Sequence, residues 1–106
     1  MKDITFIGNS LEIIRDFPEV TKREAGYQLD RVQRGLNPDD WKPMKSIGQG
    51  VCEIRIKDKD GIYRIIYVAK FEEAVYVLHA FQKKTQKTSQ DDLIIAKQAL
   101  KEILKR

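Results

Sequence analysis

The chain has one cysteine and one histidine among its 106 residues. A single Cys52 excludes an intramolecular disulfide and a zinc site made of cysteines alone. With His79 as the sole imidazole, a zinc site would need carboxylates at ligand spacing, and no segment has that spacing. We therefore expect neither a metal ion nor a small-molecule cofactor.

Long apolar runs are also missing. No stretch reaches the roughly 18 apolar residues of a membrane-spanning helix. The first residues, Met1 to Ile4, do not lead into the apolar core of a secretory signal. We therefore expect a cytoplasmic protein with no membrane partner. A length of 106 residues, with 42% hydrophobic and 34% charged residues, predicts a single globular domain over residues 1–106.

The charge is uneven. The net charge is +4, yet the first 82 residues carry equal numbers of basic and acidic side chains. The whole excess lies in residues 83–106 and is densest in residues 83–88. This location suggests an anionic partner, although a solvated tail and helix face would give the same pattern.

The first part of the chain predicts one strand and two helices. Residues 4–7 are β-prone, and a short helix at residues 11–16 is expected to be capped by Asn9 and Glu12. Pro18 is suited to the first turn of a second helix, and Gly35 ends it. The apolar stripe of that helix contains Ala25, Leu29, Val32 and Leu36.

Residues 37–50 are expected to form a loop held against the domain by Trp41, Met44 and Ile47. Three strands follow, and the Asp60-Gly61 pair marks the first hairpin. These strands are expected at residues 51–57, 62–69 and 74–82.

Ser89 and Asp92 have the spacing of a helix cap and predict a last helix. Its buried stripe would contain Leu93, Ala96, Leu100 and Ile103 or Leu104. The predicted order is β-α-α-β-β-β-α. This describes an α+β domain whose antiparallel sheet is packed by an N-terminal helix pair and a C-terminal helix.

Hairpin geometry predicts a row of ionisable side chains. Arg55 faces Arg64 if residues 58–61 form a four-residue loop, whereas Asp60-Gly61 alone as the turn places Arg64 opposite Lys57. Both registers keep the two arginines on one face. The next hairpin places Arg64 opposite His79 or Phe81. Three neighbouring strands thus present Glu53, Arg55, Arg64 and His79 on one face.

Two interpretations of this row remain open. Glu53 between the arginines would make a salt-bridged sheet surface, whereas free guanidinium groups would bind phosphate oxygens in pairs. His79 is either a half-buried strand residue or a general acid or base. Cys52 points to the opposite face and is expected to be a small core residue.

Several segments of the chain together resemble a known family. They are Trp41-Lys42-Pro43-Met44-Lys45, Val51-Cys52-Glu53-Ile54-Arg55, Tyr63-Arg64-Ile65-Ile66-Tyr67 and His79-Ala80-Phe81-Gln82-Lys83-Lys84-Thr85-Gln86-Lys87-Thr88. In this order they resemble the phage-encoded HigB-like branch of the RelE/ParE toxin superfamily. The resemblance covers nearly the whole chain.

The resemblance implies the toxin of a type II toxin–antitoxin pair. RelE-like members are metal-independent endoribonucleases that cut mRNA on the ribosome by attack of the ribose 2′-OH on the adjacent phosphate. Arg55, Arg64 and Lys84 match the basic catalytic positions of the family, and His79 or Glu53 would transfer the proton. The lysines expected to contact RNA or the ribosome are Lys45, Lys57, Lys83 and Lys87.

The resemblance also implies a partner and leaves alternatives. The partner would be a HigA-like helix-turn-helix antitoxin, whose acidic segment the basic surface would attract. ParE-like members share the fold but inhibit DNA gyrase and are not nucleases. A third alternative is an inactive prophage remnant that binds only its antitoxin.

Overall fold

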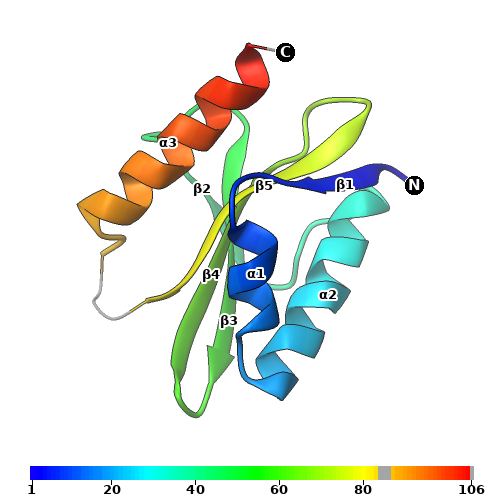
Figure 1. Cartoon of the computed structure of the whole chain (residues 1–106). Coiled ribbons are helices and arrows are strands. Elements are labelled where there is room, and N and C mark those ends of the chain that lie inside the picture. The colour runs from blue at the N-terminus through cyan, green and yellow to red at the C-terminus, as the bar shows by residue number, and fades with distance from the viewer. Residues whose placement is uncertain (84–86, 106) are drawn as a thin grey trace.

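The computed structural model describes residues 1–83 and 87–105 and forms one five-stranded sheet with three helices (Figure 1). The strands lie in the order β1-β5-β4-β3-β2 across the sheet. In chain order the elements are β1 (Asp3–Phe6), α1 (Ser10–Arg15), α2 (Glu19–Gln33), β2 (Trp41–Pro43), β3 (Val51–Asp58), β4 (Gly61–Val68), β5 (Ala74–Lys83) and α3 (Gln90–Leu104).

The α+β class is confirmed, but two details of the expected sheet are wrong. The sheet is mixed rather than antiparallel, because β1 pairs with β5 in parallel, from Asp3 opposite Ala74 to Phe6 opposite Val77. Parallel strands need a long crossover, and the chain between β1 and β5 supplies it. The expected loop at 37–50 contains the extra strand β2, which pairs with β3 at the sheet edge. Pro43 has no N–H to donate and is tolerated there because an edge strand pairs on one side alone.

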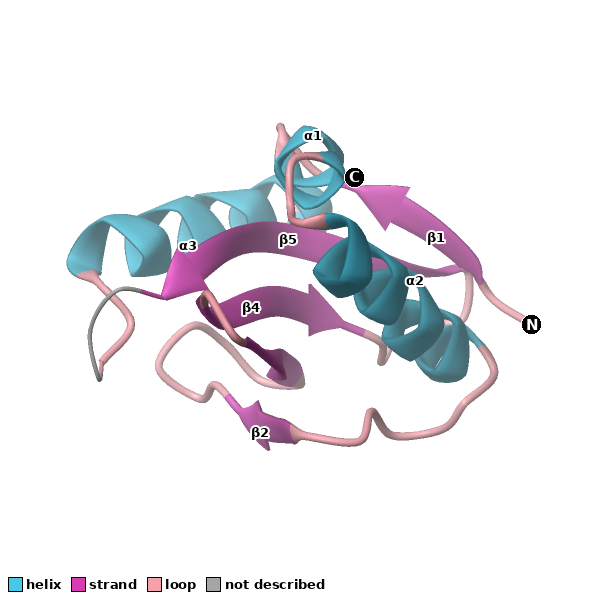
Figure 2. Cartoon of the chain, turned by 90° about the horizontal axis from the view of Figure 1, so that it is seen from below, coloured by secondary structure: helices cyan, strands magenta, loops and turns pink. Residues whose placement is uncertain are grey.

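The sheet lies between two layers of helix, and each face has its own core (Figure 1, Figure 2). On one face α3 packs through Ala96, Ala99, Leu100 and Ile103. On the other face, α1 and α2 pack through Ile14, Ala25, Leu29 and Val32. The central strands β4 and β5 are buried on both faces over most of their length, as their continuous apolar sequence predicts.

The ends of the helices follow the sequence in part. Ser89 caps α3, because its side chain accepts a hydrogen bond from the backbone N–H of Asp92, as predicted. Gly35 ends α2 with a φ of 84°, which a residue with a side chain adopts at a cost. The predicted cap at α1 is wrong, since Asn9 precedes the helix but its side chain makes no capping bond.

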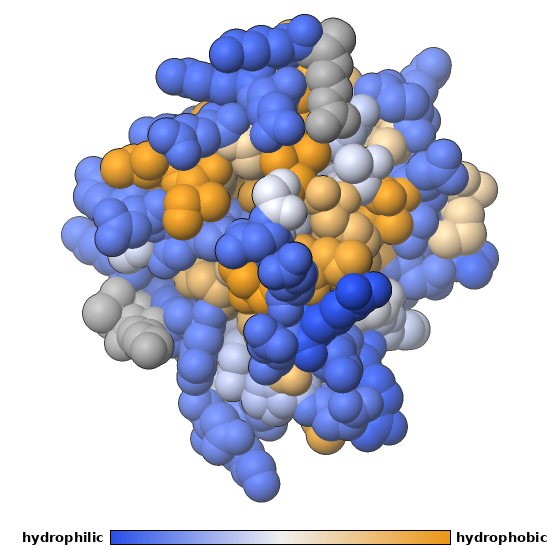
Figure 3. Space-filling model, in the orientation of Figure 1, coloured by the Kyte–Doolittle hydropathy of each residue, from blue (hydrophilic) through white to orange (hydrophobic). Residues whose placement is uncertain are grey.

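Some of the apolar residues that the sequence predicts to be buried are exposed. Met44 and Ile47 are buried and hold the segment before β3 against the domain, whereas Trp41 is 36% exposed. Leu36 and Leu104, which were expected in helix stripes, are exposed because they lie beyond or at the end of their helices. Figure 3 shows a mostly hydrophilic surface with apolar side chains gathered near the middle of the face. Among residues 1–83 and 87–105, no helix is both long and apolar enough to cross a bilayer.

Candidate anion-binding site

The two arginines of the predicted row lie directly opposite each other. In the β3–β4 ladder Arg55 pairs with Arg64 and Lys57 with Ile62, which is the register of the longer loop. Asp58 and Gly61 form the last pair of that ladder, so Lys59 and Asp60 make the tip of the hairpin. Two like charges facing each other across a ladder repel, so this pair requires a negative partner.

Glu53 supplies that partner from the same face of β3. Its side chain is fully buried, and its Oε1 accepts a hydrogen bond of 2.8 Å from Arg64 Nη1. The same oxygen lies 4.0 Å from Arg55 Nε, while Oε2 accepts a bond of 3.3 Å from the hydroxyl of Thr88. Both carboxylate oxygens are thus engaged, and the salt-bridged interpretation of the row describes Glu53 correctly.

The second hairpin contains an irregularity that brings His79 to the face of the row. Arg64 pairs with Phe81 and Ile66 with His79, and the register then shifts so that Tyr67 pairs with Val77. His79 therefore shares the face of the row, but its cross-strand neighbour is Ile66. Of the two registers predicted for Arg64, the one with Phe81 opposite is confirmed.

His79 is buried and bonded to the start of α3. Its Nε2 lies 2.7 Å from Asp92 Oδ1, and its ring stacks on Phe81 with centroids 5.3 Å apart. The other oxygen of Asp92 accepts a bond from the Ser89 hydroxyl, so one carboxylate joins β5 to the helix cap. Within the described part of the chain, His79 Nδ1 is buried and has no hydrogen-bond partner.

Further charges surround the arginine pair. Burial lowers the pKa of Arg64, and the charge of Glu53 opposes that shift, so the guanidinium stays charged at neutral pH. Burial, followed by the positive charge of Arg64, lowers the pKa of Lys83, on which Lys42 and Arg55 act in the same direction. The carboxylate of Asp40 favours the charged form of Arg64. The site is thus mainly cationic.

The surface on the α2 side of β3 has the opposite character. A hollow of about 290 Å³ there is lined by four carboxylates, from Glu24, Asp39, Asp40 and Asp58, together with the basic Arg55 and Lys57. An excess of carboxylates disfavours a polyanion at this hollow. Lys57, expected to contact RNA, is exposed beside it.

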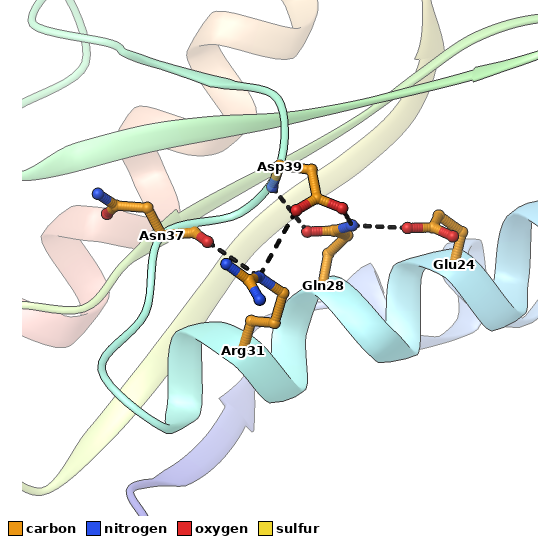
Figure 4. A network of polar contacts seen from close by, with 5 residues as sticks. All are labelled: Glu24, Gln28, Arg31, Asn37 and Asp39. Carbon is orange, nitrogen blue, oxygen red and sulfur yellow. Dashed lines mark hydrogen bonds and ion pairs between the residues drawn. The ribbon is translucent and has the colours of Figure 1, made fainter.

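A polar network fixes the wall of this hollow (Figure 4). The buried Gln28 donates to Glu24 at 2.6 Å and to Asp39 at 2.8 Å, and it accepts the backbone N–H of Asp39. Arg31 donates to the carbonyl of Asn37 and lies 3.8 Å from Asp39. The network ties α2 to the segment that leads into β2, and so positions the backbone carbonyl of Asp40, which accepts the N–H of Arg55.

The remaining predicted residues lie at varied places. Lys45 is exposed in the turn after β2, and Lys87 is exposed before α3. Lys84 lies outside the described residues. Cys52 lies on the opposite face, as predicted, but it is only partly buried at the margin of the α2-side core rather than within it. Burial raises the pKa of its thiol, and a hydrogen bond with Tyr67 offsets part of that shift.

The arrangement offers two hydrogen-bond donors whose chemistry suits an oxyanion. The Nε groups of Arg55 and Arg64 are buried, and no described residue accepts a hydrogen bond from either of them. Planar guanidinium groups with free N–H donors suit phosphate oxygens. Among the described residues, no cluster of three or more histidine, cysteine or carboxylate side chains is placed to hold a metal ion.

Four residues near the site were missed in the sequence. Thr88 and Asp92 contact Glu53 and His79 across long separations, and Lys42 and Asp40 approach the site through the unpredicted strand β2 and the residue before it. The Ser89–Asp92 spacing was a signal for the cap, but nothing in it indicated that the carboxylate also binds His79.

The fold and site together define a small α+β protein with a mixed sheet and a buried arginine–carboxylate cluster on the face covered by α3. Residues 12–101 match the family model described as "Phage derived protein Gp49-like (DUF891)". The chain belongs to this Gp49-like, phage-derived family. A search of curated proteins finds no match.

Proposed function

We propose that this protein is the toxin of a type II toxin–antitoxin system and acts as a metal-independent, ribosome-dependent mRNA endoribonuclease in the cytoplasm. One observation carries the proposal. Arg55 and Arg64 face each other on neighbouring strands, and each keeps a buried Nε donor that no described residue accepts. Such a pair fits the non-bridging oxygens of an RNA phosphate. The resemblance to HigB-like toxins, which belong to the RelE/ParE superfamily, supplies the reaction.

In this reaction the 2′-oxygen of a ribose attacks the adjacent phosphorus and the bond to the 5′-oxygen breaks. The 2′-OH proton goes to a base, the leaving 5′-oxygen takes up a proton, and a 2′,3′-cyclic phosphate remains. Negative charge grows on the phosphate oxygens, and Arg55, Arg64 and Lys84 would stabilise it. Fixed guanidinium groups serve this purpose because they need no reorganisation when the charge develops.

The two candidates for proton transfer are His79 and Glu53. Both are buried, and both are bonded to other residues, His79 to Asp92 and Glu53 to Arg64. Of the two, His79 retains a buried nitrogen, Nδ1, without a partner among the described residues. We therefore favour His79 as the residue that exchanges a proton and assign Glu53 to holding Arg64.

The proposed partners follow from charge and from the resemblance. Ribosomal RNA and mRNA would contact Lys83, which lies close enough to Arg64 to feel its charge, and the exposed Lys45 and Lys87. Lys57 borders the carboxylate-rich hollow and is the least suited of the four proposed lysines. A HigA-like helix-turn-helix antitoxin would neutralise the toxin in the cell. The basic C-terminal part of the chain would attract an acidic segment of that antitoxin.

The deciding experiment expresses the protein briefly in cells and maps mRNA ends by primer extension. Wild-type protein is expected to give cuts at fixed positions within codons, and Arg64→Ala is expected to abolish them. Arg34→Ala is the matched control, because Arg34 is an exposed arginine at the end of α2 whose pairing with Asp30 is confined to that helix. Full cleavage by Arg64→Ala would refute the proposed site.

A ParE-like function is the second candidate, and the burial of both proton-transfer groups favours it. A protein that binds DNA gyrase needs no base. Intact mRNA together with inhibited supercoiling by purified gyrase would establish this alternative. If the mRNA stays intact, gyrase is not inhibited and the protein still binds its antitoxin, the protein is an inactive remnant.

A further inference from the structure

The cluster of Arg55, Arg64 and Glu53 has more buried hydrogen-bond donors than the described residues have acceptors for. Arg64 is 4% exposed, its Nη1 is bonded to Glu53, and its buried Nε has no acceptor among the described residues. The Nε of Arg55 is in the same situation, although the Arg55 side chain itself is 34% exposed. Buried N–H groups in native proteins are nearly always satisfied. These two donors therefore suit one further oxyanion beside Glu53.

Glu53 cannot leave to make way for that anion. Its side chain is fully buried, one oxygen is bonded to Arg64, and the other accepts the hydroxyl of Thr88 from the segment before α3. An oxyanion that reaches Arg55 and Arg64 thus binds next to a fixed negative charge. The repulsion from that charge grows in proportion to the charge of the ligand.

We propose that Glu53 makes this site select singly charged phosphodiesters over doubly charged phosphate monoesters. The inference rests on the proposed function and adds to it the residue that makes the site prefer the internal linkage of a nucleic acid to its phosphorylated end. Glu53 in this role is a positioning and selecting residue. It holds Arg64 and opposes the second charge of a terminal phosphate.

Among the other charges around the cluster, the lysines act against this selection and one further carboxylate acts with it. Lys83 on β5 and Lys42 on β2 attract both kinds of ligand, more strongly the doubly charged one. Asp40, next to β2, is an additional negative charge that acts on Arg64. His79 on β5 is paired with Asp92 of α3 on the same face. Glu53 is the carboxylate in direct contact with the guanidinium group of Arg64, so its replacement isolates the effect.

The test uses two probes that differ by one charge, deoxyadenosine 5′-monophosphate and its methyl ester, titrated at pH 7.5 into the wild-type protein. Binding is followed by NMR through the Nε–Hε signals of the arginines. The wild-type protein is expected to bind the methyl ester at least as tightly as the monophosphate. A tenfold preference for the monophosphate would overturn the inference without any variant.

Glu53→Gln keeps the shape of the side chain and removes its charge. This change is expected to raise affinity for the monophosphate about tenfold more than affinity for the ester, as expected for charges about 6 Å apart at an intermediate dielectric. Glu12 is an exposed carboxylate on α1, and Glu12→Gln makes the same change in net charge. This control is expected to leave the ratio of the two affinities unchanged. Equal gains for both probes in Glu53→Gln would refute the selection.

The pH dependence gives an independent readout. A phosphate monoester loses its second charge below about pH 6. Between pH 5 and 7.5 the monophosphate is expected to gain more affinity for Glu53→Gln than for wild type, while His79 and Asp92 are common to both proteins. If neither probe shifts the arginine signals, the phosphate site itself and the proposed function fail. If both probes bind and the ratio of their affinities is the same in wild type and Glu53→Gln, only the inference on Glu53 fails and the phosphate site stands.

Discussion

His79 of β5 and Asp92 of α3 are joined by a contact of 2.7 Å, which holds the start of the last helix against the centre of the sheet. Asp92→Ala removes this bond and the acceptor of the Ser89 hydroxyl and leaves a buried imidazole unpaired. We expect the free energy of unfolding to fall by about 2–3 kcal/mol, measured by urea denaturation. Asp91→Ala, an exposed neighbour in the same turn, is the control, with an expected change below about 0.5 kcal/mol. Equal losses for the two variants would mean that the contact contributes little.

The buried pair of Glu53 and Arg64 predicts non-additive stability effects. Glu53→Ala alone is expected to lower the free energy of unfolding by about 3–5 kcal/mol, because it leaves a buried guanidinium without its partner. The double variant Glu53→Met with Arg64→Leu is expected to recover most of this loss, since matched apolar groups avoid the desolvation cost. Denaturation midpoints of the single and double variants measure the coupling. The double variant is expected to fold without toxicity, and additive losses would contradict the prediction.

Two glycines of the α2 region are expected to respond to alanine with opposite signs. Gly26 lies within α2, and a methyl group there would meet nothing within 4 Å. Gly26→Ala should therefore stabilise the protein by about 1 kcal/mol through helix propensity. Gly35 also has open space around it, but its φ is 84°. Gly35→Ala should cost about 1 kcal/mol, and thermal or urea unfolding of both variants checks the sign.

The burial of Cys52 predicts slow chemistry at its thiol. Because burial raises the pKa of this thiol, the reactive thiolate is a smaller fraction at pH 8 than for an exposed cysteine. We expect iodoacetamide to alkylate the native protein about tenfold or more slowly than the same protein in urea, measured by mass spectrometry. Equal rates in the two states would show that the thiol is accessible and unperturbed.

The sequence predicted the face of the arginine row because side-chain direction in a strand depends on parity alone. If the turn is lengthened or shortened by an even number of residues, Arg55 and Arg64 stay on one face. The structure has the register of the longer loop. The same argument placed His79 on that face, and this holds because the register shift between Ile66 and Tyr67 offsets an odd register at the turn. The shift also places Ile66, not Arg64, opposite His79. A bulge depends on twist and packing between strands, which local sequence does not encode.

Some contacts of the site could not be predicted from sequence patterns because they join segments that are far apart in the chain. The bond from Thr88 to Glu53 spans 35 positions, and the contact of His79 with Asp92 spans 13. The cap at Asn9 failed although its spacing was right, since a side chain at that position can fit the pattern without making the bond. The sequence did not predict the short strand β2 because Pro43 argues against a strand. At the edge of a sheet, however, the missing N–H of a proline is tolerated.

The parallel pairing of β1 with β5 constrains how the chain can fold while it is being synthesised. Asp3 and Ala74 are 71 positions apart, so the first strand has no partner until the segments between them have been synthesised. The hairpins from β3 to β5, by contrast, pair neighbouring segments and can form as they emerge. The α3 layer, which carries Asp92, is synthesised after β5. A nascent chain can therefore pair its two arginines from neighbouring segments, whereas the pairing of β1 with β5 requires the whole intervening chain.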